Sequence, residues 1–177
     1  MNEDNRKVYK KNVLSADSSL CIGCFSCQTA CKLEHDLPEG PRTVKVIRLG
    51  PTEHNGGLVM HYLHQTCLHC EEPACVYACP TGAMQKRDDG IVFSDPDMCI
   101  GCRTCSVACP YGVPELNTAT GKIAKCDGCR ERVDRGLWPS CALKCPTGAL
   151  TYGTADGVVR DRRDRAAARI AQSFSKP

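Results

Sequence analysis

The sequence predicts a small α+β protein, in which short hairpins and short helices surround something other than a large apolar core. The chain has 177 residues, of which sixteen are cysteine, whereas three are phenylalanine and one is tryptophan. The cysteines fall into four short runs, separated by segments with the alternation of strands and the residues of turns. A fold this poor in large apolar side chains needs another source of stability, and bound metal can provide it.

The most regular run, which we call run three, reads CIGCRTCSVACP. Cys99, Cys102 and Cys105 are three positions apart, and Cys109 follows just before Pro110. This is the bacterial iron–sulfur spacing, in which the fourth thiolate binds a second cluster. Zinc is the main alternative, but structural zinc sites are built from two separated pairs of ligands. The spacing therefore predicts iron–sulfur clusters.

Three other runs have related spacings. Run one, residues 21–31 (CIGCFSCQTAC), nearly repeats run three, with Lys32 in place of the proline. Run two, residues 67–83, has its third cysteine two positions late but keeps the CP ending in CPTGA. Run four, residues 126–149, has an eleven-residue insertion after its second cysteine and also ends in CPTGA. Because run one resembles run three and run two resembles run four, the pattern indicates duplicated ferredoxin halves.

All sixteen cysteines are candidate ligands, and no catalytic residue is assigned. They are Cys21, Cys24, Cys27, Cys31, Cys67, Cys70, Cys75, Cys79, Cys99, Cys102, Cys105, Cys109, Cys126, Cys129, Cys141 and Cys145. Histidine replaces cysteine at some iron–sulfur sites. Since cysteine can fill every ligand position of four clusters, His54, His61, His64 and His69 are expected in hydrogen-bonding or surface roles.

The connecting segments predict local elements. Residues 42–49 and 58–63 read as two strands joined near Gly56-Gly57, and residues 83–93 as a hairpin around an Asp-Gly turn. Residues 32–36 read as a short helical continuation, and residues 1–14 as an extended arm or edge strand. Arg130, Arg132 and Arg135 suggest a charged helical turn, which is either a solvated face or a docking surface.

Residues 158–177 are rich in alanine and arginine and predict a helix from about Asp161. Its apolar side includes Ile170 and Phe174, four positions apart, and is too narrow for a stable isolated helix. We expect this tail either to pack on the domain or to dock on another chain, and docking, including self-association, is favoured.

Charge and targeting signals exclude several classes. The formal net charge is +3, but four clusters of about −2 each would bring it to about −5. A nucleic-acid partner is therefore not expected. No run of eighteen apolar residues is present, so no direct membrane span is expected. The first twenty residues lack an apolar signal core and a twin arginine, which favours a reducing, cytoplasmic location over a secreted disulfide scaffold, unless a partner that carries a signal exports the chain.

From Cys21 to Ala149, the four runs resemble the four-cluster electron-transfer subunits of molybdenum and tungsten oxidoreductases, of the dimethyl sulfoxide reductase iron–sulfur subunit type. The segments that carry the resemblance are QTCLHCEEPACVYACPTGA, CIGCRTCSVACPYG and KCDGCRERVDRGLWPSCALKCPTGAL. The chain is also similar to small polyferredoxin subunits of formate dehydrogenase, hydrogenase and tungsten aldehyde oxidoreductase complexes.

The resemblance implies two ferredoxin-like dicluster modules, one nested in the other. Residues 67–109 would form the inserted module, residues 1–66 and 110–157 the outer module, and residues 158–177 a helical tail. The implied ligand sets are Cys21, Cys24, Cys27 with Cys145; Cys126, Cys129, Cys141 with Cys31; Cys67, Cys70, Cys75 with Cys109; and Cys99, Cys102, Cys105 with Cys79. The order of the repeats alone equally allows a tandem pairing. Cys102 stands where nitrate reductase relatives have tryptophan, which implies four 4Fe-4S clusters.

The function implied by the resemblance is the relay of single electrons between a large molybdenum- or tungsten-pterin catalytic subunit and a further redox partner. The sequence itself contains no dinucleotide fingerprint, phosphate-binding loop or acid–base pair, so the chain is not expected to be an enzyme. Two alternatives stay open at this point. One is a free polyferredoxin that shuttles between enzymes, and the other is a scaffold subunit that joins copies into a longer wire.

Overall fold

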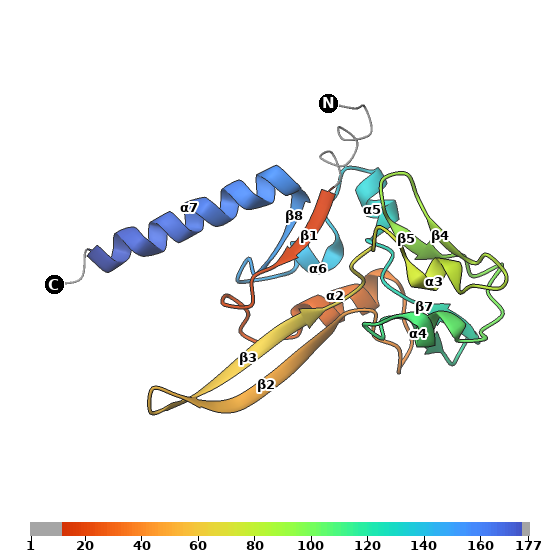
Figure 1. Ribbon diagram of the computed structural model, residues 1–177, viewed down its shortest axis with the longest axis horizontal. Helices are drawn as coiled ribbons and strands as arrows, with labels where there is room; N and C mark the ends of the chain where they lie inside the picture. Colours follow the sequence, from red (N-terminus) through yellow and green to blue (C-terminus); the bar gives the residue numbers. More distant parts are fainter. Residues whose placement is uncertain (1–11, 175–177) are drawn as a thin grey trace. The chain divides into compact units, whose positions relative to one another are not determined.

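A computed structural model describes residues 12–174 of the chain (Figure 1). Its strands are β1 (Asn12–Ala16), β2 (Lys45–His54), β3 (Gly57–Gln65), β4 (Met84–Lys86), β5 (Val92–Ser94), β6 (Glu115–Asn117), β7 (Lys122–Ala124) and β8 (Leu150–Thr154). Its helices are α2 (Ser26–Glu34), α3 (Ala74–Tyr77), α4 (Thr104–Ala108), α5 (Arg130–Asp134), α6 (Ser140–Leu143) and α7 (Ala155–Phe174). The predicted α+β class, with short elements and a C-terminal helix, is confirmed.

Two compact units make up the described chain. One contains residues 12–15 and 151–174, and the other runs from Ala16 to Leu150. All sixteen cysteines lie in the second unit. This grouping of contacts does not test the predicted boundaries at residues 66/67 and 109/110. Of the expected N-terminal arm or edge strand, residues 1–11 lie outside the described residues, and residues 12–14 are part of β1.

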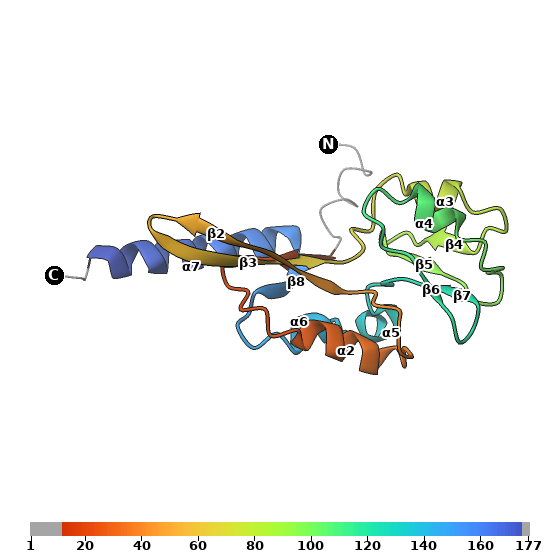
Figure 2. The same ribbon diagram turned by 90° about the horizontal axis from the view of Figure 1, so that it is seen from below.

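The strands form two-stranded sheets, which pair β1 with β8, β2 with β3, β4 with β5 and β6 with β7. The longest ribbon is the antiparallel β2–β3 hairpin, which is plain in both views (Figures 1 and 2). Its turn is at Asn55 and Gly56, with φ of 50° and 75°, as a two-residue type I′ turn requires. The strand expected over 42–49 extends to His54, past an irregularity between Leu49 and Thr52.

The backbone repeats itself where the sequence does. The N–H of Asp17, before run one, donates to the carbonyl of Ala149 at the end of run four, at 2.8 Å. The N–H of Asp95, before run three, donates in the same way to the carbonyl of Ala83 at the end of run two, also at 2.8 Å. Correspondingly, β8 follows run four and pairs with β1, while β4 follows run two and pairs with β5.

The apolar core is as small as the composition predicts. Its largest fully buried side chains are Val44 and Val92. One core cluster around Val92 combines aliphatic side chains with three thiols, and consists of Cys75, Ala83, Met84, Val92, Cys99, Cys105 and Ile123. Because cysteines form much of the buried surface, the packing of this unit depends on what those thiols bind.

The charged insertion of run four forms α5, and its side chains are used within the chain. Arg132 pairs with Glu34 of α2 at 3.1 Å, and its Nε donates to the carbonyl of Trp138 at 2.8 Å. Asp134 accepts two hydrogen bonds from Arg87, at 2.9 and 2.6 Å. These contacts tie Arg132 and Asp134 to α2 and to Arg87, whereas Glu131 and Arg135 are exposed, so the two interpretations of this charged turn stay open.

The C-terminal helix α7 begins at Ala155, six residues before the predicted start at Asp161. Among its described residues only Val158 is buried, while Ile170 and Phe174 are 57% and 82% exposed. Within residues 12–174, no helix has both the length and the apolar character that crossing a membrane requires.

Candidate iron–sulfur sites

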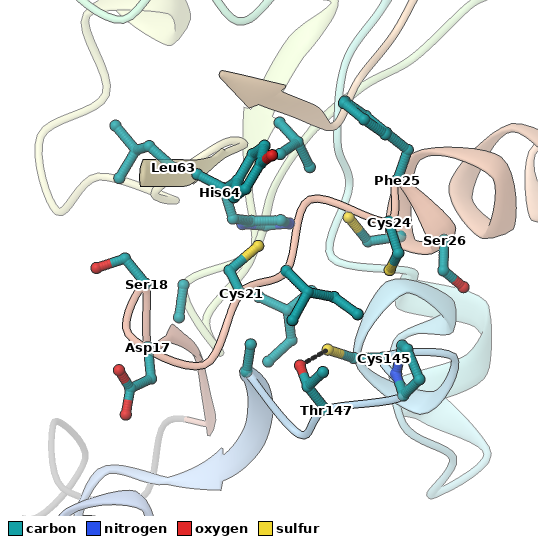
Figure 3. A pocket seen from close by; sticks show the side chains of 18 residues that line it. Asp17, Ser18, Cys21, Cys24, Phe25, Ser26, Leu63, His64, Cys145 and Thr147 are labelled. Carbon is teal, nitrogen blue, oxygen red and sulfur yellow. Dashed lines mark hydrogen bonds between the residues drawn. The ribbon is translucent and has the colours of Figure 1, made fainter. Parts of the chain in front are cut away.

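Three hollows of the second unit are each lined by four cysteines. The first is lined by group one, which consists of Cys21, Cys24, Cys27 and Cys145. Figure 3 shows Cys21 and Cys24 coming from the loop before α2 and Cys145 from the loop after α6, with the Cys21 sulfur directed toward the ring of His64. Cys27 lies in the first turn of α2. Residues far apart in the sequence therefore converge on one hollow, which combines runs one and four.

The other two hollows combine runs two and three. Group three lines one of them and consists of Cys67, Cys70, Cys75 and Cys109. Group four lines the other and consists of Cys79, Cys99, Cys102 and Cys105. In each hollow one cysteine comes from one run and three come from the other, which is the exchange of the fourth thiolate that the spacing predicts.

The remaining cysteines form group two, Cys31, Cys126, Cys129 and Cys141, all of which are buried. Burial raises the pKa of Cys31 and of Cys129 to about 12, and the charge of Cys126 adds to both shifts. The pKa of Cys141 is raised as well, by burial and then by the charges of Cys126, Cys129 and Cys31. Thiols so placed do not ionise alone, and bound metal is what makes such a group stable as thiolates.

The CPTGA endings give their cysteines a different environment. Burial works against ionisation of Cys145, but the backbone N–H groups of Leu150, Thr147 and Ala149 outweigh it and lower the pKa of its thiol. At Cys79, burial is likewise outweighed by backbone N–H groups at the end of run two, and the pKa of the thiol is lowered. The turn is possible because the glycine of each ending has a φ near 65–69°. Concave sets of N–H groups of this kind bind anions, including cluster sulfur.

The glycines of the CIGC loops explain why runs one and three have the same local shape. Gly101 has a φ of 70°, and a Cβ there would lie 2.2 Å from the carbonyl oxygen of Gly121. Gly23 has a φ of 67°, and its Cβ would overlap the ring of Tyr62. Both positions therefore require glycine, because the backbone is left-handed and the space beside it is filled.

Unpartnered polar atoms test whether these hollows suit a sulfur-rich group. His64 Nε2 and Ser94 Oγ are buried and have no hydrogen-bond partner among the described residues. His64 lines the hollow of group one, and Ser94 lines that of group four. Buried polar atoms are normally satisfied, and the sulfur atoms of a bound cluster would be acceptors for both. The donor set and these orphan atoms fit 4Fe-4S clusters.

Sequence reasoning missed several polar partners of the cysteines. The Thr43 hydroxyl lies 3.0 Å from Cys31 Sγ, and His35 Nε2 lies 3.4 Å from Cys129 Sγ. Lys125 is 8% exposed and lowers the pKa of Cys67 together with hydrogen bonds from His69, which outweigh the effect of burial. Of these, Lys125 carried a signal because it directly precedes Cys126, and His69 was among the histidines expected to form hydrogen bonds.

The four histidines expected in hydrogen-bonding or surface roles have different surroundings, and His64 Nε2 is buried with no hydrogen-bond partner among the described residues. His54 and His61 are exposed on the β2–β3 hairpin, while His69 makes hydrogen bonds near two groups of cysteines. Trp138, in the insertion of run four, is 45% exposed. Cys24 and Cys102 are the exposed members of groups one and four.

Comparisons with known proteins agree with this chemistry. Residues 58–155 match the model of a 4Fe-4S dicluster domain, and residues 20–83 match a second model with the same description. The B subunit of anaerobic dimethyl sulfoxide reductase from Escherichia coli (strain K12) is 45% identical over 158 residues, which cover 85% of this chain and 77% of that protein. The thiosulfate reductase electron transfer subunit PhsB of Salmonella typhi is 41% identical over 146 residues, covering 81% and 76%.

A third relative is YnfG of Escherichia coli (strain K12), a probable anaerobic dimethyl sulfoxide reductase subunit. It is 45% identical over 146 residues, which cover 77% of this chain and 70% of the relative. Cysteine groups, family models and relatives thus point the same way, and the chain belongs to the family of iron–sulfur electron-transfer subunits built from 4Fe-4S dicluster domains.

Proposed function

We propose that this chain holds four 4Fe-4S clusters and relays single electrons between a large molybdenum- or tungsten-pterin catalytic subunit and a further redox partner. The observation that carries the proposal is the gathering of sixteen free thiols into four groups of four. One cluster for each group gives the count of four. The names of the relatives, which are subunits of reductases, support the role of a subunit beside a catalytic chain.

The four groups are the proposed ligand sets, and they equal the sets expected from the family resemblance. Nested modules are favoured over tandem ones because each cysteine group draws either on runs one and four or on runs two and three. The hydrogen bonds of Asp17 to Ala149 and of Asp95 to Ala83 support the same pairing. In this proposal residues 67–109 form the inserted module, residues 1–66 and 110–157 the outer one, and residues 158–177 the tail.

In this proposal, the chain's own residues would bind the clusters, orient them and shield them from water. The clusters, when bound, would accept and release one electron at a time. The thiolates of each group would hold a cluster in place, and the N–H groups after Cys79 and Cys145 would stabilise its negative charge. Burial of group two keeps water away from its sulfur atoms. Reactions on a substrate are assigned to the partner, because the relatives are named as subunits of reductases.

The proposed compartment is a reducing one, and the cytoplasm is the default. Its support is that sixteen closely grouped thiols would form disulfides in an oxidising compartment before clusters could be inserted. A partner that carries an export signal would take the assembled subunit elsewhere, and locating the tagged chain by cell fractionation distinguishes the two.

Anaerobic capture through a tag on this chain, followed by metal and mass analysis, tests the proposal. We expect about sixteen iron atoms per chain, together with molybdenum or tungsten and one large co-purifying protein. Iron at that level with neither pterin metal nor partner would instead establish a free polyferredoxin. About eight iron atoms or fewer in freshly isolated protein would contradict the four-cluster count.

A second role, self-association through residues 158–177, is favoured by the exposure of Ile170 and Phe174 on α7. Docking of this helix on another copy would make a longer wire. Replacing both residues with lysine leaves the buried Val158 in place and should reduce the size of the particle in solution. If the size of the particle were unchanged, α7 would not be the site of self-association.

A further inference from the structure

His69 stands between two groups of cysteines. It lies in the loop between Cys67 and Cys70 and has a φ of 47°. Its Nδ1 accepts a hydrogen bond from the backbone N–H of Val92 at 2.9 Å, and its Nε2 lies 3.9 Å from Cys126 Sγ. The backbone N–H of His69 donates to Cys67 Sγ at 3.4 Å, and the His69 side chain also lowers the pKa of that thiol. His69 therefore contacts group three and group two.

The bond with Val92 decides which nitrogen carries the proton. A backbone N–H can only donate, so Nδ1 of His69 presents a lone pair and the proton is on Nε2. Val92 is 1% exposed, so water does not compete for this bond. Nε2–H is therefore the atom that faces sulfur, and a hydrogen bond to a thiolate is strengthened by its charge.

Lys125 binds the same residue, Val92, through the carbonyl of the next peptide group. Its ammonium group donates to the carbonyl of Val92 and, at 2.6 Å, to the carbonyl of Cys126. Val92 thus binds His69 through its N–H and Lys125 through its carbonyl. Beside them, a Cβ at Gly128 would lie 3.6 Å from Nε2 of His69, so the ring is closely packed where run four passes it.

We propose that His69 is a positioning residue that links the cysteine groups of Cys67 and Cys126 and raises the reduction potentials of both clusters. A hydrogen bond to ligand sulfur favours the reduced, more negative cluster, and a higher potential follows. Groups two and three belong to different proposed modules, so this ring sets the potentials on both sides of the junction between them. The inference rests on the proposed function.

Two variants test the roles of the two ring nitrogens separately. In His69→Asn, the side-chain oxygen can replace Nδ1 as acceptor for Val92, but the donor to sulfur is lost. Asparagine also tolerates the left-handed backbone. In His69→Gln, the longer amide reaches the place of Nε2 and keeps a donor. His61→Asn, on exposed β3, is the matched control.

Each protein is purified anaerobically with its partner, its iron is counted, and its clusters are titrated potentiometrically with detection by electron paramagnetic resonance. We expect His69→Asn to shift two of the four cluster potentials downward at unchanged iron content. His69→Gln should return both toward the wild-type values, and His61→Asn should shift none.

The inference is overturned if His69→Asn keeps its iron and no potential moves, or all four move together. If His69→Asn loses iron, the result for His69→Gln tests the inference instead. Retained iron with wild-type potentials then supports the donor role, whereas lost iron or lowered potentials overturn it. The iron content of the wild-type protein tests the proposed function separately, because the variants are compared with it at equal iron.

Discussion

Asp17 is joined to Ala149 by a backbone hydrogen bond of 2.8 Å, which closes the chain from before run one to the end of run four. A side-chain bond nearby has the same effect, since Ser26 Oγ donates to the carbonyl of Lys144 at 2.8 Å. Groups one and two depend on this closure, because each takes thiols from both ends of the cysteine-bearing segment.

Replacing Cys105 with serine should remove one cluster. Cys105 is 5% exposed and lines the hollow of group four with three other thiols. We expect the iron content to fall by about four atoms per chain, with loss of electron transfer to the physiological acceptor. Thr118→Ser, on an exposed turn, is the control. Unchanged turnover in Cys105→Ser would argue against a linear relay through all four clusters.

Gly101→Ala should be far more damaging than Gly112→Ala, although both glycines have a positive φ. The Cβ at position 101 meets the carbonyl oxygen of Gly121 at 2.2 Å, whereas nothing lies within 4 Å of a Cβ at position 112. Backbone strain alone costs about 1–2 kcal/mol, and the overlap at position 101 adds about 1–3 kcal/mol. Anaerobic denaturant unfolding with an iron assay measures this, and equal midpoints for the two variants would count against the close approach.

His64 should make stability depend on pH. Burial lowers the pKa of its imidazole from 6.5 to about 4, so between these values the unfolded chain binds more protons than the folded one. The free energy of unfolding should therefore be highest above about pH 6.5 and fall as the pH drops toward 4, by up to about 3 kcal/mol.

The variant His64→Phe should lack this part of the pH dependence, and His54→Phe, on the exposed hairpin, should keep it. Denaturant titrations of the iron-loaded proteins at a series of pH values provide the comparison. Identical pH profiles for wild type and His64→Phe would show that the imidazole titrates normally.

Thr43→Val should change one cluster's potential with little loss of fold. The Thr43 hydroxyl lies 3.0 Å from Cys31 Sγ, and valine keeps its shape while removing that hydrogen bond. We expect one potential to move downward. Thr66→Val is the control, because the Thr66 hydroxyl donates to the Thr43 carbonyl at 3.1 Å and not to sulfur. It should cost about 1 kcal/mol of stability and leave all four potentials in place.

Cysteine spacing and turn residues predicted much of the local structure. The β2–β3 and β4–β5 hairpins, the helical turn at residues 130–134 and the tail helix all follow from short-range patterns. The helix α7 begins earlier than predicted because Thr154 Oγ1 accepts the N–H of Gly157 at 3.2 Å and so caps it. The prediction had begun after the glycine and two valines, which are poor helix formers.

The polar partners of the cysteines could not be predicted from the sequence, because most of them come from distant positions in the chain. Thr43 and Cys31 are brought together by the packing of two separate segments, and His69 meets Cys126 from 57 positions away. No periodic pattern encodes such pairs. The spacing within each run shows which thiols can share a loop, whereas the partner run that supplies the fourth thiol needs tertiary structure or a family resemblance.

The contact between Ser26 and Lys144, 118 positions apart in the chain, sets the order in which the protein can be made. The hairpin of β4 and β5 uses neighbouring residues and can close while the ribosome is still adding run four. The pairing of run one with run four must wait until Lys144 and Cys145 have emerged. Until then the thiols of run one are left exposed, so a newly made chain is most vulnerable to oxygen at its N-terminal run.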